Sequence, residues 1–194
     1  MIVTPFDAIA RLLATAGARD YLGEPVTVVQ HLLQAGALAE AAGAAPAVVA
    51  AALLHDVGHL LEVAGQASGP QLMAGHDHDH AGLGAGWLAS WFGPEVTEPV
   101  RLHVAAKRYL CGTDPGYYEL LSQASRYTLA LQGGPMTAQQ AATFEALPAH
   151  RDAVAVRRWD DQAKDAAARV PGLDHYRPLL AGLARPGAGR AGKN

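Results

Sequence analysis

The sequence has nine histidines in 194 residues, and several of them stand beside aspartate. His55 and Asp56 are adjacent within a stretch that otherwise consists of alanine, valine and leucine. An ionised carboxylate is costly in apolar surroundings unless a positive charge compensates it. A bound metal ion gives that compensation, and a carboxylate can bridge two ions because it has two oxygens. For the dipeptide alone, a helix cap or a salt bridge made by Asp56 explains the pair equally well.

Other side chains able to bind metals lie on separate expected helices: His31, His80, His103 and Asp161. Each of these histidines, taken singly, is more simply explained as a buried core residue. Together with His55 and Asp56 they form the pattern of a carboxylate–imidazole metal site in the core of a helical bundle. Nitrogen and oxygen ligands without thiolate favour iron or manganese, with zinc less favoured.

The elements that must position these side chains are helices, because alanine and leucine dominate and runs of β-branched residues are short. Residues 62–79 have the composition of a loop. We find neither an internal repeat nor a linker between two cores, so the sequence predicts one all-α domain over residues 1–185 and a disordered tail over 186–194. Helices are expected over residues 5–16, 26–42, 47–61, 80–91, 99–110, 117–131, 137–146, 151–168 and 176–184.

The overall composition limits the functional class. Half of the residues are hydrophobic, 17% are charged and the net charge is −3, which is typical of a globular protein without an electrostatic preference for nucleic acid. No stretch is long and apolar enough to span a bilayer, and the N-terminus lacks the cationic head of a signal peptide. The single cysteine, Cys111, fits a reducing cytoplasm, where we expect the protein to be. The oligomeric state stays open.

The order of the candidate ligands, namely His31, His55-Asp56 and a later Asp161, resembles the HD-domain superfamily of metal-dependent phosphohydrolases and oxygenases. Additional histidines in between, here His80 and His103, are typical of its dinuclear members. From residue 21 to about residue 165 the chain more closely resembles the mixed-valent di-iron oxygenases that cleave the carbon–phosphorus bond of 1-hydroxyphosphonates. The matching stretches are YLGEPV (21–26), LLHDVGH (53–59), HVAAKRYL (103–110), LQGGPM (131–136) and RWDD (158–161).

This resemblance implies an HD-domain helical bundle that binds two iron ions, Fe(II) and Fe(III), with dioxygen as co-substrate. It implies that one iron is held by His31, His55, Asp56 and Asp161, and that Asp56 bridges to a second iron held by His80 and His103. Two other loop histidines, His76 and His78, compete with His80 for this role. We prefer His80 because the stretch that follows it resembles the corresponding helix of the family.

Helical spacing places polar residues beside the predicted ligands. His59 follows His55 by four residues, Lys107 follows His103 by four, and Arg158 precedes Asp161 by three. Two cations beside a metal pair suit a doubly charged phosphonate. The resemblance assigns phosphonate binding to His59, Lys107, Ser125 and Arg158, with Arg157 as a competing candidate for the arginine.

The loop before the first ligand helix contains Tyr21 and Glu24. The resemblance makes both of them active-site lid residues, and with His59 they are the predicted catalytic residues. Tyr21 would occupy the vacant iron position until substrate displaces it, and Glu24 would receive the far end of the substrate. A turn with a packing tyrosine is the alternative explanation for Tyr21 and Glu24. Taken singly, a surface lysine, a salt-bridged arginine and a packing serine explain Lys107, Arg158 and Ser125 more simply.

The activity that the resemblance implies is oxidative cleavage of a small 1-hydroxyphosphonate to phosphate and a carboxylate. The 2-amino-1-hydroxyethyl compound would give glycine and its 2-trimethylammonio counterpart glycine betaine, and the sequence does not choose between them. One alternative is an HD-domain hydrolase in which the same ligands activate water against a phosphate ester or a nucleotide. Others are an inositol-oxygenase-like enzyme, suggested by the stretch over 103–109, and a metal or ligand sensor without catalysis.

Overall fold

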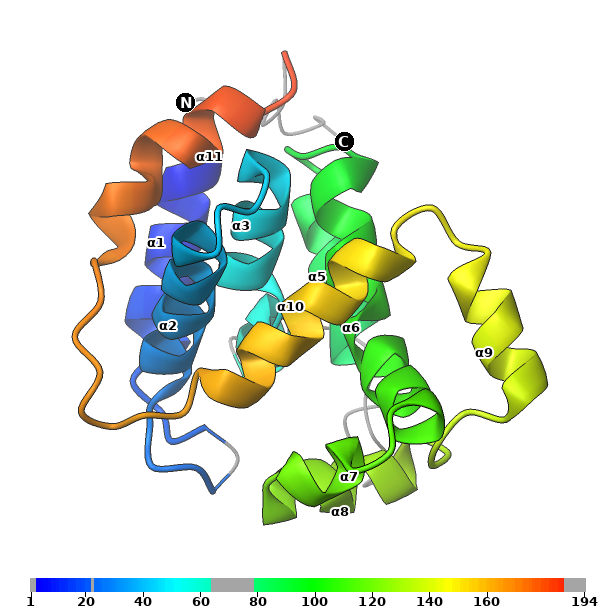
Figure 1. Cartoon of the computed structure of the whole chain (residues 1–194). Coiled ribbons are helices and arrows are strands. Elements are labelled where there is room, and N and C mark those ends of the chain that lie inside the picture. The colour runs from blue at the N-terminus through cyan, green and yellow to red at the C-terminus, as the bar shows by residue number, and fades with distance from the viewer. Residues whose placement is uncertain (1–2, 22, 64–78, 187–194) are drawn as a thin grey trace.

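The fold is built from helices (Figure 1). The computed structural model describes residues 3–21, 23–63 and 79–186, and within them the β-type pairing is limited to one bridge between Asp20 and Thr27. The predicted all-α class is therefore confirmed. The elements are α1 (Pro5–Ala16), α2 (Val28–Ala41), α3 (Pro46–Leu54), α4 (Val57–Val63), α5 (His80–Leu88), α6 (Pro94–Thr113), α7 (Tyr117–Leu120), α8 (Gln123–Leu131), α9 (Ala138–Glu145), α10 (His150–Gln162), the 3-10 helix η2 (Leu173–Tyr176) and α11 (Arg177–Leu183).

The core forms around α3, which is apolar on every side. Its residues from Val48 to Leu54 are all buried, as expected for a helix in the middle of a bundle. Helix α3 packs against α2 and α6, and α10 crosses all three of these helices (Figure 1). Polar side chains on the inward faces of these four helices must therefore lie close together.

The predicted helix over 47–61 is instead two helices, α3 and α4, which are separated at His55 and Asp56. Successive residues of a regular helix point about 100° apart, so they do not reach the same point. At the break, the His55 Nδ1 lies 2.8 Å from the Ala52 carbonyl oxygen, and the Asp56 carbonyl accepts the His59 amide at 3.1 Å. The interruption allows both adjacent side chains to enter one polar cluster.

A glycine allows α4 and α5 to approach each other closely. A Cβ atom added to Gly58 would lie 1.9 Å from the His80 carbonyl oxygen, so any larger residue would push the backbone of α5 away. Because His80 is the first residue of α5, this close approach also determines where the His80 ring lies. Gly58 thus couples the packing of two helices to the position of a predicted ligand.

We expect Gly58→Ala to destabilise the protein by about 1 to 3 kcal/mol, because overpacking of a rigid contact has this cost. The variant should also bind less metal at the position that includes His80. Gly86→Ala is the matched control, since Gly86 is exposed on α5, the helix that Gly58 approaches, and an added Cβ would meet nothing within 4 Å. Urea unfolding and metal analysis of both variants test this. Equal stabilities would contradict the role of Gly58 in this packing.

Two other predicted helices have different limits in the structure. Helix α6 begins at Pro94, so Pro99 lies inside it and not near its start. A proline in this position removes one backbone donor, and contacts of α6 with α3, α5 and α10 retain the helix. The predicted helix over 117–131 is divided into α7 and α8, because the Ser122 hydroxyl caps α8 by accepting the Ser125 amide at 3.1 Å.

Helix α10 ends at Gln162, six residues before the predicted end at residue 168. The segment after it is held in a non-helical path by α2. The His31 Nδ1 lies 2.9 Å from the Ala163 carbonyl oxygen, and the side-chain amide of Gln34 bonds to both the N–H and the C=O of Asp165. Tertiary contacts from a distant helix therefore set this boundary, which local sequence patterns do not encode.

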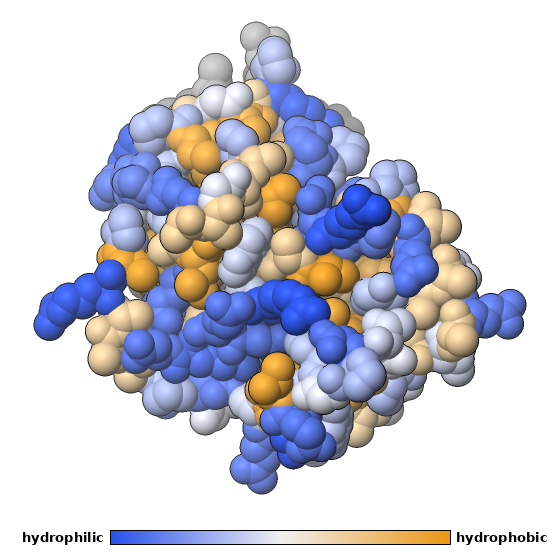
Figure 2. Space-filling view, in the orientation of Figure 1, coloured by the Kyte–Doolittle hydropathy of each residue, from blue (hydrophilic) through white to orange (hydrophobic). Residues whose placement is uncertain are grey.

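Several predictions about caps and surface can be compared directly with the structure. Thr4 caps α1, with Pro5 as its first residue, and the predicted capping box of Thr137 and Gln140 is present. No helix in the described ranges has the length and hydropathy needed to cross a bilayer. Polar and hydrophobic residues are interspersed over the face drawn in Figure 2. Most of the predicted loop over 62–79, with His76 and His78, and most of the predicted tail over 186–194 lie outside the described residues.

Candidate metal centre

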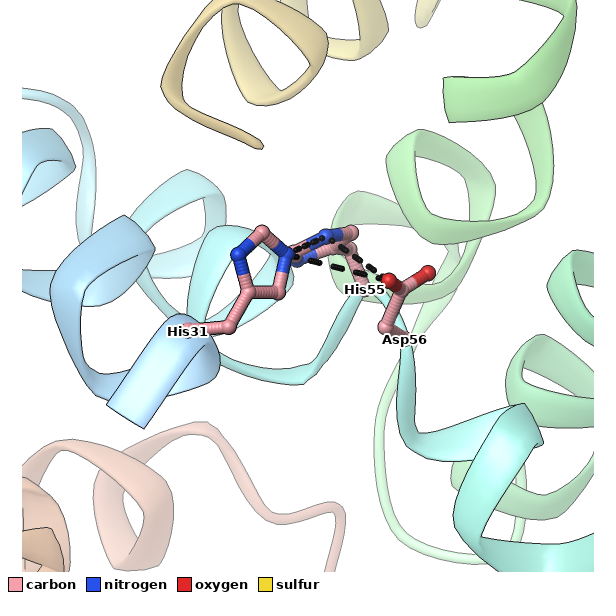
Figure 3. Close-up of side chains that lie close together, drawn as sticks. All are labelled: His31, His55 and Asp56. Atoms are coloured by element: carbon pink, nitrogen blue, oxygen red, sulfur yellow. Dashed lines mark hydrogen bonds and ion pairs between the residues drawn. The ribbon is translucent and has the colours of Figure 1, made fainter. Parts of the chain in front are cut away.

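Five of the predicted ligands meet in the core as two groups that share one residue. His31, His55 and Asp56 form one group, and Asp56, His80 and His103 form the other. In each group the ligand atoms lie within 4.8 Å of one another, and all five residues are buried. Figure 3 shows how the side chains of the first group converge. Asp56 is therefore placed to bridge two metal positions.

The hydrogen bonds of three histidine rings define which nitrogen faces the cluster. The Nδ1 atoms of His31, His55 and His103 lie 2.9, 2.8 and 2.7 Å from backbone carbonyl oxygens. A carbonyl oxygen can only accept, so Nδ1 carries the hydrogen and Nε2 presents a lone pair. Burial lowers the pKa of His31 to about 4, although Asp160 opposes this effect. At neutral pH its ring is thus in the uncharged form that binds metals.

The Nε2 atoms of the four histidines converge. The Nε2 atoms of His31 and His55 are 3.1 Å apart, and those of His80 and His103 are 3.2 Å apart. Asp56 Oδ1 lies 3.3 Å from Nε2 of His80 and of His103, yet it makes no hydrogen bond with the described residues. Acceptors at such distances repel each other unless a cation lies between them, and ligands of one ion with bonds of about 2.1 Å have similar separations. The residues fit a metal pair.

Removal of metal should destabilise the protein, because the facing lone pairs then lose the cations that compensate them. We expect the melting temperature of the metal-free protein to rise by several degrees when Fe(II) is added without oxygen, since a ligand that binds only the folded state stabilises it. Differential scanning calorimetry measures this rise. A melting temperature that does not change with saturating Fe(II) would contradict a preformed site.

On α10, the aspartate that faces the histidines is Asp160, one residue before the predicted ligand Asp161. Asp160 is buried, with Oδ1 3.4 Å from His31 Nε2 and Oδ2 3.8 Å from His55 Nε2. Asp161 instead accepts hydrogen bonds from Tyr117 and Arg157, away from the histidines. Adjacent helical residues point about 100° apart, so only one aspartate of this doublet can face α2 and α3. The placement expected for Asp161 is corrected to Asp160.

The arginine beside the cluster is likewise one residue earlier than predicted, at Arg157 and not at Arg158. Arg158 is exposed and pairs with Asp114 at 2.8 Å. Arg157, the competing candidate, is buried, and its Nη1 lies 2.7 Å from Asp160 Oδ2. The structure identifies this register, because the buried residues Ala153 and Val156 precede Asp160 at helical spacing.

Tyr21, an expected lid residue, contacts both Asp56 and His31. Its hydroxyl donates to Asp56 Oδ2 at 2.7 Å, and its ring stacks on that of His31 with 3.8 Å between centroids. Burial, followed by the charges of Asp160 and Asp56, raises the pKa of this phenol well above its usual range. Tyr21 is thus a protonated donor in direct contact with the shared carboxylate.

The remaining predicted substrate residues lie around the cluster. The His59 ring stacks on that of His80 with 3.9 Å between centroids. Lys107 is buried, and its Nζ donates to the Thr128 hydroxyl at 2.8 Å. Ser125 and Glu24 both contact Lys164, at 3.2 and 3.0 Å from its Nζ. Lys164 was not among the predicted functional residues, because nothing in the local sequence distinguishes it from a surface lysine.

Comparison with known proteins defines the class to which this chain belongs. A family model described as "HD domain" matches residues 28–138, more than half of the chain. The matched range contains both histidine groups and Asp56 and ends before α10. The chain is therefore a member of the HD-domain family, as the sequence resemblance implied.

Two similar relatives have 42% identity to this chain. A [1-hydroxy-2-(trimethylamino)ethyl]phosphonate dioxygenase (glycine-betaine-forming) from Leisingera caerulea aligns over 84% of this chain and 82% of its own length. A hydroxymethylphosphonate dioxygenase from Gimesia maris aligns over 89% and 86%. An uncharacterised protein, L432, from Acanthamoeba polyphaga mimivirus is 32% identical over 92% of this chain and 81% of its own length. Within the HD-domain family, the chain thus belongs with the hydroxyphosphonate dioxygenases.

Proposed function

We propose that this chain is a di-iron dioxygenase that cleaves the carbon–phosphorus bond of a small 1-hydroxyphosphonate. The observation that carries this proposal is the position of Asp56, with Oδ2 facing His31 and His55 and Oδ1 facing His80 and His103. The names of the two relatives at 42% identity support the reaction type and the substrate class. The resemblance to mixed-valent di-iron oxygenases supports iron in both positions.

The residues divide into two ligand sets. One iron would be held by His31, His55, Asp56 and Asp160, and the other by Asp56, His80 and His103. This nitrogen and oxygen donor set, without thiolate, suits iron. Bound there as Fe(II) and Fe(III), the pair would supply the redox chemistry with dioxygen.

The charges around the cluster suit a phosphonate once metals are bound. Among the described residues named above, with neutral histidines, four carboxylates (Glu24, Asp56, Asp160 and Asp161) and three cations (Lys107, Arg157 and Lys164) leave a net charge of −1. Two iron ions would make the site strongly positive. A doubly charged phosphonate is attracted to such a site, where Lys107 and Arg157 can hold its oxygens.

The protein residues have distinct tasks in the reaction. Dioxygen and the 1-hydroxyphosphonate together give a carboxylate, phosphate and a proton, with loss of the C1–H and C–P bonds. Tyr21 donates a hydrogen bond to the shared carboxylate of Asp56 until the substrate displaces the tyrosine. His59, stacked on His80, is the titratable group that can exchange a proton with the phosphonate. A cytoplasmic location accords with this role and stays a prediction.

Oxygen uptake and phosphate release by the iron-loaded protein test this proposal. We expect both with a panel of 1-hydroxyphosphonates that includes hydroxymethylphosphonate, and neither without oxygen. A phosphomonoester tested under strict anaerobiosis is the control for the hydrolase alternative. Phosphate release from the ester, with all hydroxyphosphonates left intact, would refute the oxygenase. Iron uptake without turnover of either class would support the sensor alternative.

A further inference from the structure

Near the metal cluster, Glu24 forms an ion pair with Lys164, a residue that has no predicted role. Lys164 Nζ lies 3.0 Å from Glu24 Oε1, and it also contacts the hydroxyls of Ser125 at 3.2 Å and Ser122 at 3.4 Å. The two charged side chains are only 13% and 12% exposed. Glu24 and Ser125 are expected substrate residues, so Lys164 lies among groups that face the substrate.

The backbone around Lys164 is fixed on both sides. The preceding residue, Ala163, accepts the Nδ1–H of His31, and the following residue, Asp165, bonds to the side-chain amide of Gln34. Both contacts come from α2, the helix that supplies a predicted metal ligand. These bonds oppose a shift of the segment, so Lys164 would leave Glu24 by a movement of its side chain.

The ion pair is close to the metal cluster. Lys164 Nζ lies 5.9 Å from the centre of the Tyr21 ring, and the hydroxyl of that ring contacts Asp56 Oδ2 at 2.7 Å. A small molecule bound at the metals in the place of the tyrosine would thus meet Glu24 and Lys164 with its far end. The substituent on C1 of a hydroxyphosphonate would be this far end.

A cationic substituent would compete with Lys164 for Glu24. To pair with Glu24 it must displace the lysine ammonium. Among the described residues, the hydrogen-bond partners of this mostly buried ammonium would then be the Ser122 and Ser125 hydroxyls. Loss of one partner from a buried ion pair is strongly unfavourable. A hydrogen or an uncharged group on C1 leaves the pair intact.

We propose that Lys164 is a specificity-determining residue that selects 1-hydroxyphosphonates without a cationic substituent on C1. This inference rests on the proposed function and narrows its substrate class. Of the two relatives at 42% identity, one is named for a substrate with a trimethylamino group and the other for hydroxymethylphosphonate. Lys164 places this chain with the second in substrate preference.

Two substrates that differ in charge alone test the proposal. The 1-hydroxy-2-(trimethylammonio)ethyl and 1-hydroxy-3,3-dimethylbutyl phosphonates have the same shape, with nitrogen replaced by carbon. We expect the iron-loaded wild type to have the higher kcat/KM for the uncharged compound. Lys164→Gln should raise kcat/KM for the cationic compound relative to that for the uncharged compound by about tenfold or more. Loss of a competing charge alters discrimination by this order.

The control variants are compared by the same ratio of kcat/KM values for the cationic and the uncharged compound. Glu24→Gln combined with Lys164→Gln should abolish the increase for the cationic compound, because its ammonium group then has no Glu24 carboxylate with which to pair. Arg101→Gln removes a cation from an exposed pair with Glu98 and should leave the ratio unchanged. A ratio that stays within about twofold in Lys164→Gln, or a wild type that already prefers the cation, would overturn the proposal.

A binding measurement separates this inference from the proposed reaction. The corresponding phosphonates without the hydroxyl group are not substrates of the proposed reaction, so calorimetry gives their affinities for the iron-loaded protein. Lys164→Gln should raise the affinity for the cationic analogue, relative to that for the uncharged analogue, by the same factor. If the affinities shift as expected but no hydroxyphosphonate is cleaved, the proposed reaction fails while the selectivity stands. If cleavage occurs and the affinities do not shift, the role of Lys164 fails alone.

Discussion

Asp160→Asn is expected to remove iron from the position shared with His31 and His55 and to lower phosphate release by about 100-fold or more, since even outer-shell changes at metal sites cost 10- to 100-fold. The carboxylate lies 3.4 and 3.8 Å from the two Nε2 atoms and is buried. Asparagine keeps the shape but removes the negative charge that a metal ligand provides. Iron content and phosphate release under saturating oxygen measure the effect.

Asp161→Asn is the matched control, because it makes the same chemical change one residue further along α10. Asp161 bonds to Tyr117 and Arg157 and not to the histidines. We therefore expect this variant to retain both irons and to lose activity only through a less firmly held Arg157. Loss of iron in Asp161→Asn, with full iron in Asp160→Asn, would contradict the assignment on α10.

His103→Ala is expected to remove the second iron and most of the activity while the first iron stays bound. His103 Nε2 is 3.3 Å from Asp56 Oδ1 and 3.2 Å from His80 Nε2. Without it, this position has only the shared carboxylate and one imidazole among the described residues, too few ligands for tight binding. Metal analysis should therefore give about one iron per chain in place of two.

The control for this variant is His175→Ala, which removes a histidine that pairs with Glu40 on the surface, where the His175 side chain is 46% exposed. Its iron content and activity should equal those of the wild type. Retention of two irons in His103→Ala would mean that another residue completes the second position, and the proposed ligand set would then be wrong. Circular dichroism of both variants separates loss of ligand from loss of fold.

The sequence predicted the helical class and most helix locations because alanine-rich composition and caps such as Thr4 and Thr137 act locally. It did not predict the break at His55 and Asp56 or the end of α10 at Gln162. The end of α10 depends on side-chain contacts made by a distant helix, for example Gln34 with Asp165. Local patterns carry no information on such contacts.

The candidate site was predictable in its ligand types but not in its register on α10. The doublets of arginine and aspartate over 157–161 permit two registers, and the resemblance favoured the one with Asp161. The burial pattern through Val156 resolves the register in favour of Asp160. Lys164 was not predicted for another reason. Its partner Glu24 is 140 residues away in the chain, so no local pattern connects the two.

His80 was predicted as a ligand in preference to two other loop histidines. His80 lies in the cluster as predicted, with Nε2 3.3 Å from Asp56 Oδ1. The competing candidates His76 and His78 lie outside the described residues. The choice of His80 over these two histidines therefore stays a prediction.

The most direct test of the shared-carboxylate iron pair is anomalous diffraction at the iron edge from crystals of the iron-loaded protein. Two peaks are expected about 3.5 to 4 Å apart, one bonded to His31, His55 and Asp160 and the other to His80 and His103, with the Asp56 carboxylate bonded to both. A single peak, or two peaks of which neither contacts Asp56, would contradict the iron pair.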